Sequence, residues 1–568
     1  MTGDDAVWSA VGRGPDGTVD VVDLAADGTE LSRAAIPLAQ LPAHVATRTH
    51  RRWVWSDTVR WYPALLAAGV DVSRCHDLRL CHAILRHSAL VDDASDVRAA
   101  TAWDAATAES PASMAPALFE LDARAAGVPD AIDEVLAEFA RHRAAMAGAA
   151  GPRLRLLLAA ESAGALIAAE LHAAGLPWDT AVHDAILTET LGARPGPGRQ
   201  PARVEQLSAE VRDALGDPGA SLDSQPKLLR ALHRVGVLAR STSRWELSEF
   251  DHPVIAPLLA YKKLTRLLSA NGWAWMAEWA PEGRFRPVYV PGGVVTGRWA
   301  SSGGGALQLP RQLRPAVRAD PGWVLVIADV AQLEPRVLAA MSHDSALAAA
   351  ASGVDLYEGI VASGVVPTRQ DAKIAVLGAM YGATTGDSGR LVPALRRAYP
   401  AAMRLVDDAA RIGEEGGTVT TWLGRSSPPP GPGWRELQAR AGAPDADDAD
   451  RTRAVRAARD RGRFTRNFVV QGTAAEWALA WLADLRGRLQ AFPPAPTSAP
   501  RSGVVFGDRA HLAFFLHDEI IVHTPAEHAD AVAEEVRAAA ARAATLLFGG
   551  FPIDFPLDLR VGPDAGKA

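Results

Sequence analysis

Cysteine is nearly absent from this chain, and so are long apolar runs and an N-terminal basic segment. Cys75 and Cys81 are the only two cysteines among 568 residues, which excludes a disulfide framework and a cysteine-rich zinc site. No apolar run is long enough to span the ~30 Å hydrocarbon core of a membrane. The first residues, MTGDDAVWSAVG, are acidic and lack the basic and apolar regions of a signal peptide. We therefore expect a cytoplasmic protein with no membrane partner.

An excess of positive charge is also absent, because the net charge is −7. This value alone argues against a general nucleic-acid binder, but the charge is unevenly distributed. Residues 224–318 carry a net charge of +9, and residues 451–466 carry +6. Such asymmetry is typical of a positive channel in an acidic body. Solvated, salt-bridged helix faces would produce the same clusters, so charge leaves both readings open.

The length implies several domains, since a single hydrophobic core stops growing at roughly 250–300 residues. Residues 1 to about 110 alternate short apolar runs with turns, which predicts a small α/β domain. The run WVLVIA, Trp323–Ala328, predicts a buried strand. Leu512–Val522 predicts two strands that meet at a tight connection, and residues 333–490 are predicted to be mainly helical.

Acidic residues stand at the ends of these apolar strands. Asp329 follows WVLVIA and precedes a helical pattern, where a lone aspartate is most often a helix cap. Asp518 and Glu519 lie between the runs AFFL and IIVH. Carboxylates that are forced together repel each other unless a cation neutralises them. Asp329 and Asp518 side by side would suit Mg²⁺, which combines a few carboxylates with water and phosphate oxygens.

Two stripes of functional side chains are predicted on helices between these acids. Residues at four-residue steps trace one slowly turning helix face. The first stripe is formed by Arg369, Lys373, Leu377 and Tyr381, and the second by Arg463, Asn467 and Gln471. Cations near a helix N-terminus are unfavourable with the helix dipole, so the first stripe favours an external polyanion. A solvated helix face is the alternative for each stripe.

Five motifs in order resemble those of family A DNA polymerases, the bacterial DNA polymerase I type. They are TGRWASSGGGALQLPR, DVAQLEPR, RQDAKIAVLGAMYG, RNFVVQGTAAEW and LHDE, and the resemblance spans Glu161 to Gly562. ESAGALIAAELHAAGLPWD is similar to the helix that opens the family's polymerase domain, and SQPKLLRALHRVG is similar to its thumb entry.

The resemblance implies a multidomain α/β protein with a right-hand polymerase fold of palm, fingers and thumb. A small RNase H-like α/β domain of the 3′–5′ exonuclease type would precede it. The implied boundaries are residues 1–140 for the degenerate exonuclease-like domain, 141–285 for the entry helix and thumb, 286–345 for the first part of the palm, 346–492 for the fingers and 493–568 for the second part of the palm.

The implied activity is DNA-templated addition of dNTPs to a primer 3′-OH by two-metal phosphoryl transfer. Asp329 and Asp518 would hold two Mg²⁺ ions, for which Mn²⁺ would substitute. The carbonyl of Val330 and the carboxylate of Glu519 would belong to the same metal site. Lys373 would donate a proton to the leaving pyrophosphate and so join the two aspartates as a catalytic residue.

The remaining implied roles concern the nucleotide and the DNA. Glu334 resembles the family's steric gate, which crowds a ribose 2′-OH. The other residues implied to bind the dNTP are Gln332, Arg369, Lys373, Leu377 and Tyr381. The residues implied to bind primer–template DNA are Lys262, Lys263, Arg298, Arg336, Arg463, Asn467, Gln471 and His517.

The chain departs from the family pattern at several positions. Val330 replaces an aromatic residue, Tyr357 a histidine, and Leu377 a phenylalanine or tyrosine. In the N-terminal domain the first strand, AVWSAVGRG, holds no acid, and Trp61 replaces the aspartate of the second exonuclease motif. We therefore expect no proofreading, although Asp57 and Asp77 remain.

Two other functions are considered. One is a phage-like single-subunit RNA polymerase, against which Glu334 and the QGTAAE stretch argue. The other is an inactive DNA-binding remnant, which the presence of Asp329, Lys373 and Asp518 disfavours. A monomer associated with the nucleoid is expected.

Overall fold

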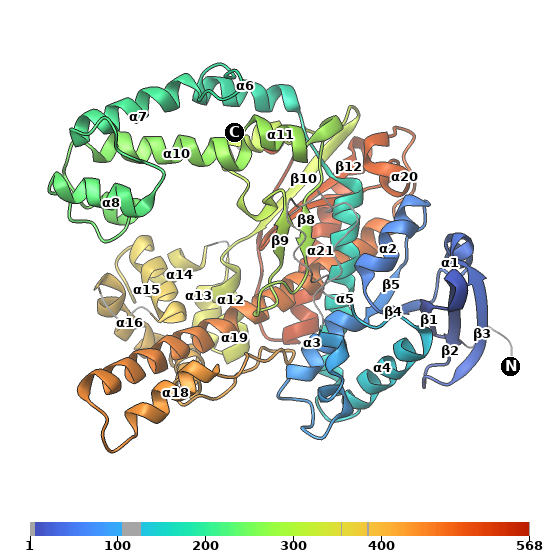
Figure 1. The fold of residues 1–568 in the computed structure, drawn as a ribbon. Helices are drawn as coiled ribbons and strands as arrows, with labels where there is room; N and C mark the ends of the chain where they lie inside the picture. Colours follow the sequence, from blue (N-terminus) through green and yellow to red (C-terminus); the bar gives the residue numbers. More distant parts are fainter. Residues whose placement is uncertain (1–5, 105–126, 354, 383–385, 567–568) are drawn as a thin grey trace. The chain divides into compact units, whose positions relative to one another are not determined.

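The computed structural model describes residues 6–104, 127–353, 355–382 and 386–566 (Figure 1). The chain forms two compact units. The first comprises Met1–Ala174, Val288–Ser302 and Pro321–Val561, and the second comprises Gly175–Pro287, Gly303–Asp320 and Gly562–Ala568. Within the described ranges, every helix is too short or too polar to span a membrane.

The first unit begins with a five-stranded sheet in the order β3-β2-β1-β4-β5. Its strands are β1 (Trp8–Arg13), β2 (Thr18–Leu24), β3 (Glu30–Pro37), β4 (Arg52–Trp55) and β5 (Arg74–Asp77). β1 pairs antiparallel with β2, and β2 with β3, whereas β1, β4 and β5 run parallel. This is the RNase H-like arrangement expected from the sequence.

β4 alternates its side chains between two cores, so both faces of the sheet are buried at this strand. Trp53 and Trp55 belong to one core with Tyr62. Val54 belongs to the other core with Phe139. The helices that cover the sheet are α2 (Thr58–Ala67), α3 (Leu78–His87), α4 (Ile132–Ala145) and α5 (Gly151–Ala174).

A second sheet of the first unit has the order β11-β12-β10-β13. Its strands are β10 (Trp323–Val330), β11 (His511–Leu516), β12 (Glu519–Pro525) and β13 (Leu557–Gly562). The structure confirms the predicted buried strand and extends it to Val330. It also confirms the tight connection, since only His517 and Asp518 separate β11 from β12.

Five further helices belong to the first unit. They are α12 (Leu333–Ser342), α15 (Arg369–Tyr381), α17 (Pro400–Glu414), α19 (Asp448–Gln490) and α21 (Ala529–Phe548). α19 packs against α17, α21 and α5. Its 43 residues begin at a capping box between Asp447 and Asp450, which satisfies the first free N–H groups of the helix.

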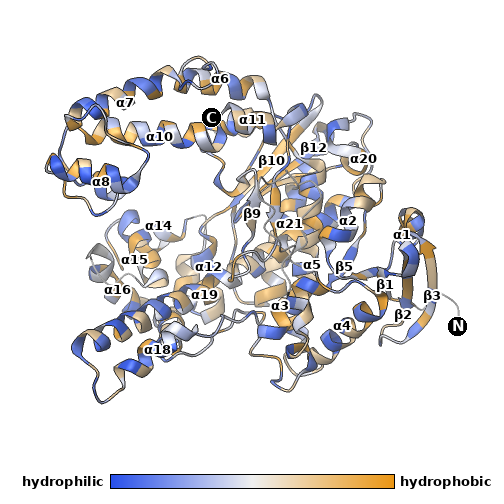
Figure 2. Ribbon diagram, viewed as in Figure 1, coloured by the Kyte–Doolittle hydropathy of each residue, from blue (hydrophilic) through white to orange (hydrophobic). Residues whose placement is uncertain are grey.

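The second unit is mainly helical. Its helices are α6 (Thr180–Leu191), α7 (Ala202–Leu215), α8 (Gln225–Arg234), α9 (Arg244–Leu247), α10 (Ile255–Asn271) and α11 (Trp273–Trp279). α7 packs against α10. Figure 2 shows hydrophilic and hydrophobic residues alternating along both helices, as expected for helices with one buried face.

The other helices and strands are short. They are α1 (Leu41–Ala46), α13 (Ser345–Ala350), α14 (Leu356–Ala362), α16 (Gly386–Ala398), α18 (Pro432–Ala441), α20 (Gly503–Phe506), β6 (Leu176–Pro177), β7 (Arg284–Phe285), β8 (Val288–Val290) and β9 (Ala300–Gly303).

The predicted boundary between residues 140 and 141 is wrong, because it falls inside α4. The entry helix α5 also belongs to the first unit rather than with the helices that follow it. The physical reason is that α5 packs against α2, α3 and α19, so its contacts lie with both sheets of that unit.

A buried ion pair joins α19 to the N-terminal sheet region. Arg486 contacts both carboxylate oxygens of Glu170, with nitrogen–oxygen distances of 2.6–3.0 Å. It also donates to the carbonyl of Ser73 at 2.8 Å, and the hydroxyl of Tyr62 donates to Glu170 at 2.6 Å. The Arg486 side chain is 6% exposed, so its charge depends on these partners.

Arg486→Met should lower the free energy of unfolding by about 3–5 kcal/mol, because the buried Glu170 carboxylate loses its counter-charge. Arg488→Met is the matched control. Its side chain is 32% exposed and pairs with Asp484 and Glu535 near the surface, so the expected loss is below about 1 kcal/mol. Urea unfolding followed by circular dichroism measures both. Equal losses would contradict a stabilising role for the buried pair.

Candidate active site

Three carboxylates gather at one end of the sheet formed by β10 and β12. Asp329 is the penultimate residue of β10 and lies directly opposite Glu519, the first residue of β12. Cross-strand partners place their side chains on the same face of a sheet. Asp518 precedes Glu519, and its carbonyl accepts a hydrogen bond from the N–H of Val330 at 3.0 Å. The sheet register therefore holds these acids together.

The electrostatics of this group favour a cation. Burial and the neighbouring Asp329 carboxylate raise the pKa of Asp518 to about 6. A divalent cation would remove both penalties, because it neutralises the charge and replaces the lost hydration. Carboxylate oxygens and the nearby Val330 carbonyl form the hard oxygen donor set that Mg²⁺ prefers, so the residues fit the expected metal.

A charged cluster stands beside these acids. Glu334 lies in the first turn of α12, after Gln332 in the left-handed backbone conformation (φ 48°). Its carboxylate forms an ion pair with Arg298 and accepts a hydrogen bond from the Tyr381 hydroxyl at 2.7 Å. Burial and Glu334 raise the pKa of Tyr381 well above its usual value. Glu334 is therefore fixed between the β8–β9 region and α15.

A cavity of about 310 Å³ joins this cluster to the carboxylates. Its polar and aromatic lining includes Arg298, Gln332, Glu334, Tyr357, Tyr381, His517 and Asp518. Leu377 and Phe515 contribute apolar surface. His517 has a positive φ of 58°, and burial together with Arg298 lowers its pKa, which favours the neutral ring.

Helix α15 presents its predicted stripe away from the core. Its buried residues, among them Ala372 and Val376, lie on the other face. Lys373 is exposed, while Leu377 and Tyr381 line the cavity. Arg369 is 47% exposed and donates two hydrogen bonds to Asp355, at 2.7 and 2.9 Å.

Asp355 was not singled out from the sequence. It caps α14 through the N–H groups of Tyr357 and Glu358 and holds Arg369 at the same time. The signal is the Asp-x-x-Glu pattern of DLYE, which is typical of a helix N-terminus. Its second role depends on the approach of α15 and is not visible in the local sequence.

The predicted stripe on α19 is only partly exposed to solvent. Arg463 forms an ion pair with Asp460 and keeps half of its side chain exposed, while Asn467 and Gln471 are half-buried. Leu377 and Tyr381 of the α15 stripe line the 310 Å³ cavity, whereas none of these three residues does.

The predicted DNA contact of Arg336 is wrong. Its side chain is fully buried, and its guanidinium donates to the carbonyls of Ala331 at 2.9 Å and Ala351 at 2.6 Å. It also donates to the carbonyls of Gly353 and Asp554, both at 3.0 Å. Arg336 therefore organises the backbone beside the end of β10.

The two lysines that are predicted to contact DNA lie in the second unit and differ in their exposure to solvent. Lys262 is half-buried and donates to the hydroxyl of Thr242 at 2.8 Å, and burial lowers its pKa. Lys263 is exposed. DNA binding by this pair stays a prediction, and the geometry favours Lys263 as the available cation.

The comparisons with known proteins identify the family. The family model for DNA polymerase family A matches residues 201–564, which is more than half of the chain. The chain belongs to DNA polymerase family A. The expected multidomain α/β class and family are thereby confirmed.

Two curated family A relatives are similar in sequence. The thermostable DNA polymerase I of Thermus thermophilus is 28% identical over 400 residues, covering 64% of this chain and 43% of the relative. DNA polymerase I of Chloroflexus aurantiacus is 28% identical over 346 residues, covering 56% of this chain and 33% of the relative. The chain thus spans less than half the length of these relatives.

A solved structure shares the fold of this chain. It is the POL domain of Pol1 from M. smegmatis in complex with DNA primer-template and dNTP. The TM-score is 0.67 at 18% sequence identity, and the match covers 98% of this chain and 95% of that one. The similarity therefore extends over the N-terminal sheet as well as the polymerase region.

In this family A chain, the remaining acids of the N-terminal domain serve as structural groups. Asp57 caps α2 and pairs with Arg79 at 2.9 Å, and Asp77 caps α3. Burial and Asp77 raise the pKa of Asp57 to about 6. The indole of Trp61 donates to Asp130 at 3.2 Å, at the position expected for an exonuclease aspartate.

Proposed function

We propose that this chain is a DNA-templated DNA polymerase that adds dNTPs to a primer 3′-OH. The observation that carries the proposal is that Asp518, Glu334 and Tyr381 line one cavity, with Asp329 beside Asp518 at the end of the same sheet. The cations of α15 stand on the same helix face as Tyr381. Acids for metals, a fixed carboxylate and phosphate-binding cations are the groups that nucleotidyl transfer needs.

Asp329 and Asp518 would hold two Mg²⁺ ions, with Val330 and Glu519 at the same site and Mn²⁺ as a substitute. When bound, the two ions activate the primer hydroxyl and stabilise the charge that develops on the leaving pyrophosphate. The protein supplies the geometry, since the pairing of β10 with β12 and the Val330–Asp518 hydrogen bond keep the acids in place.

The nucleotide would lie between this acid group and α15. Lys373 is exposed and available to bind the triphosphate and to donate a proton to pyrophosphate. Arg369 would exchange its Asp355 partner for phosphate oxygens, which bind a guanidinium in the same bidentate way. Gln332, Leu377 and Tyr381 would contact the sugar and base.

Primer–template DNA is the proposed partner. Arg298 and His517 border the cavity, and Arg463, Asn467 and Gln471 follow one face of α19. Such side chains can bind phosphates, sugars and minor-groove acceptors that all correct base pairs share. A monomeric state and a nucleoid location stay predictions.

Asp518→Asn should reduce Mg²⁺-dependent primer extension to below a few per cent of the unmodified protein, because the metal site loses a charged ligand. Binding of the primer–template duplex should be nearly unchanged. Asp508→Asn is the matched control, because the side chain of this acid is 46% exposed and pairs with its neighbour Arg509 at 3.7 Å. Single-turnover extension and fluorescence anisotropy give the two readouts.

Retention of extension by Asp518→Asn would contradict the metal assignment. Incorporation of ribonucleotides in preference to dNTPs would favour the RNA polymerase alternative, for which the structure provides no supporting observation. If the unmodified protein does not extend the primer, this result would favour the alternative of an inactive remnant.

Glu334→Ala should lower the dNTP/rNTP ratio of kcat/KM by at least about tenfold, because the gate acts by crowding the ribose 2′-OH. Arg298 and Tyr381 hold the carboxylate in place, so it cannot turn away from a ribonucleotide without breaking both contacts. Steady-state incorporation of dATP and ATP opposite the same template base measures the ratio. An unchanged ratio would show that Glu334 is not the gate.

We also infer that the protein does not proofread. The inference rests on Asp57 and Asp77, which are engaged as helix caps, and on Trp61, which stands where the family resemblance implies an aspartate and donates to Asp130. A primer with a mismatched 3′ end should therefore keep its length during incubation with Mg²⁺ or Mn²⁺ and no dNTP. Shortening that is lost in Asp57→Asn but not in Asp518→Asn would overturn this inference.

A further inference from the structure

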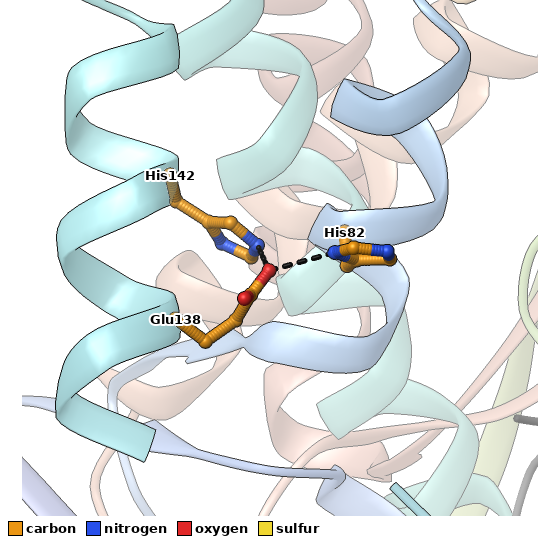
Figure 3. A group of neighbouring side chains, drawn as sticks. All are labelled: His82, Glu138 and His142. Atoms are coloured by element: carbon orange, nitrogen blue, oxygen red, sulfur yellow. Dashed lines mark hydrogen bonds and ion pairs between the residues drawn. The ribbon is translucent and has the colours of Figure 1, made fainter. Parts of the chain in front are cut away.

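We propose that His82, Glu138 and His142 form a binding site for Zn²⁺ inside the N-terminal domain. The three side chains are fully buried and come from two helices, α3 and α4 (Figure 3). This site is separate from the polymerase centre, and the proposal does not depend on the polymerase activity.

The donor atoms of the three residues converge on one point. Nδ1 of His82 and Nε2 of His142 lie 2.7 and 2.8 Å from the same oxygen, Oε1 of Glu138. One donor atom from each residue lies within 4.8 Å of the others. Glu138 and His142 are four residues apart and therefore share one face of α4, which Figure 3 shows turned toward His82 on α3.

Two of the three ligands, Glu138 and His142, are also held through their other polar atom. Oε2 of Glu138 binds Arg141 at 2.6 Å, and Nδ1 of His142 contacts Nε2 of His76 at 3.0 Å. Nε2 of His82 lies 3.4 Å from Asp104. Partners of this kind orient the ligands of metal sites and are part of their construction.

The possible proton positions on the rings of His82 and His142 favour a cation at this point. If neutral His82 donates from Nδ1 to Glu138, its Nε2 carries a lone pair that faces the Asp104 carboxylate, so two acceptors meet. A metal at Nδ1 instead leaves the proton on Nε2, where it can be donated to Asp104. In the same way, a metal at Nε2 of His142 leaves Nδ1 to donate to His76.

The donor set selects the metal. Two imidazole nitrogens and one carboxylate oxygen are the ligands of one class of protein site for Zn²⁺. Such a site has three protein ligands, and water takes the fourth position. Mg²⁺ prefers oxygen ligands alone. Tetrahedral zinc requires ligand atoms about 3.3 Å apart. Each histidine nitrogen would therefore move about half an ångström away from Oε1 of Glu138, and the three donor atoms already lie within 4.8 Å of one another.

The position of the site indicates a structural role. A bound ion would join α3 to α4, and the segment after α3 reaches the polymerase region through Ser88, whose hydroxyl donates to the carbonyl of Gly424 at 2.7 Å. The ion would thus brace a domain whose own acids no longer form a complete catalytic set.

The test is the zinc content of the full-length chain, measured by elemental mass spectrometry after dialysis against metal-free buffer. An Asp329→Asn/Asp518→Asn background removes binding at the polymerase site. We expect about one zinc per chain in this background and less than about a tenth of that in Glu138→Gln and in His142→Gln. His44→Gln, at a half-buried histidine of α1 outside the cluster, is the matched control and should retain zinc.

A second readout identifies the ligands. Replacement of zinc by Co²⁺ should give the visible absorption of a tetrahedral cobalt site, and Glu138→Gln should abolish it. His76→Gln should weaken zinc binding by about 10–100-fold without abolishing it, because His76 only orients His142.

Several results would overturn the proposal. One is an absence of zinc and of a cobalt spectrum in the background protein, and another is unchanged zinc content in both ligand variants. If the variants fail to fold, the background protein still decides, since a chelator should lower its melting temperature by several degrees and added Zn²⁺ should restore it. No response to the chelator would mean that the three residues form a metal-free hydrogen-bond network.

Discussion

The mutual repulsion of carboxylates at the end of β10 and β12 is the constraint on which the rest of the site depends. Asp329 and Glu519 face each other across two buried strands, and Asp518 lies in the connection between β11 and β12. Apolar burial of the strands overcomes this repulsion during folding, and burial together with the Asp329 carboxylate raises the pKa of Asp518. This end of the sheet therefore favours a cation.

The groups around the acids are held by contacts of two kinds. Arg369 pairs with Asp355 at a partly exposed position, where such a pair contributes little stability and, in the proposed function, would exchange for phosphate. Arg336, in contrast, is buried and bound to four backbone carbonyls. Two arginines of the same region therefore serve different purposes, and burial is what distinguishes them.

In the N-terminal domain, buried aspartates satisfy backbone N–H groups at helix starts. Asp57 and Asp77 cap helices, and Trp61 fills space next to Asp130. The tryptophans of β4 pack one face of its sheet, and the proposed zinc site lies on the other side with α3 and α4. The domain is also joined to α19 by the buried pair of Arg486 and Glu170, so its stability bears on the polymerase region.

The sequence by itself determined the strands of the polymerase sheet, the acids at their ends and the stripe on α15. These features are local: apolar runs define strands, and four-residue spacing defines a helix face. Motif order then identified the family. The tertiary structure alone decided that Arg336 is buried, because its partners Ala351 and Asp554 lie far away along the chain. It also brought His82 to Glu138, 56 residues away, through the packing of α3 on α4. Contacts between distant segments depend on how helices and sheets pack, and local patterns carry no record of that packing.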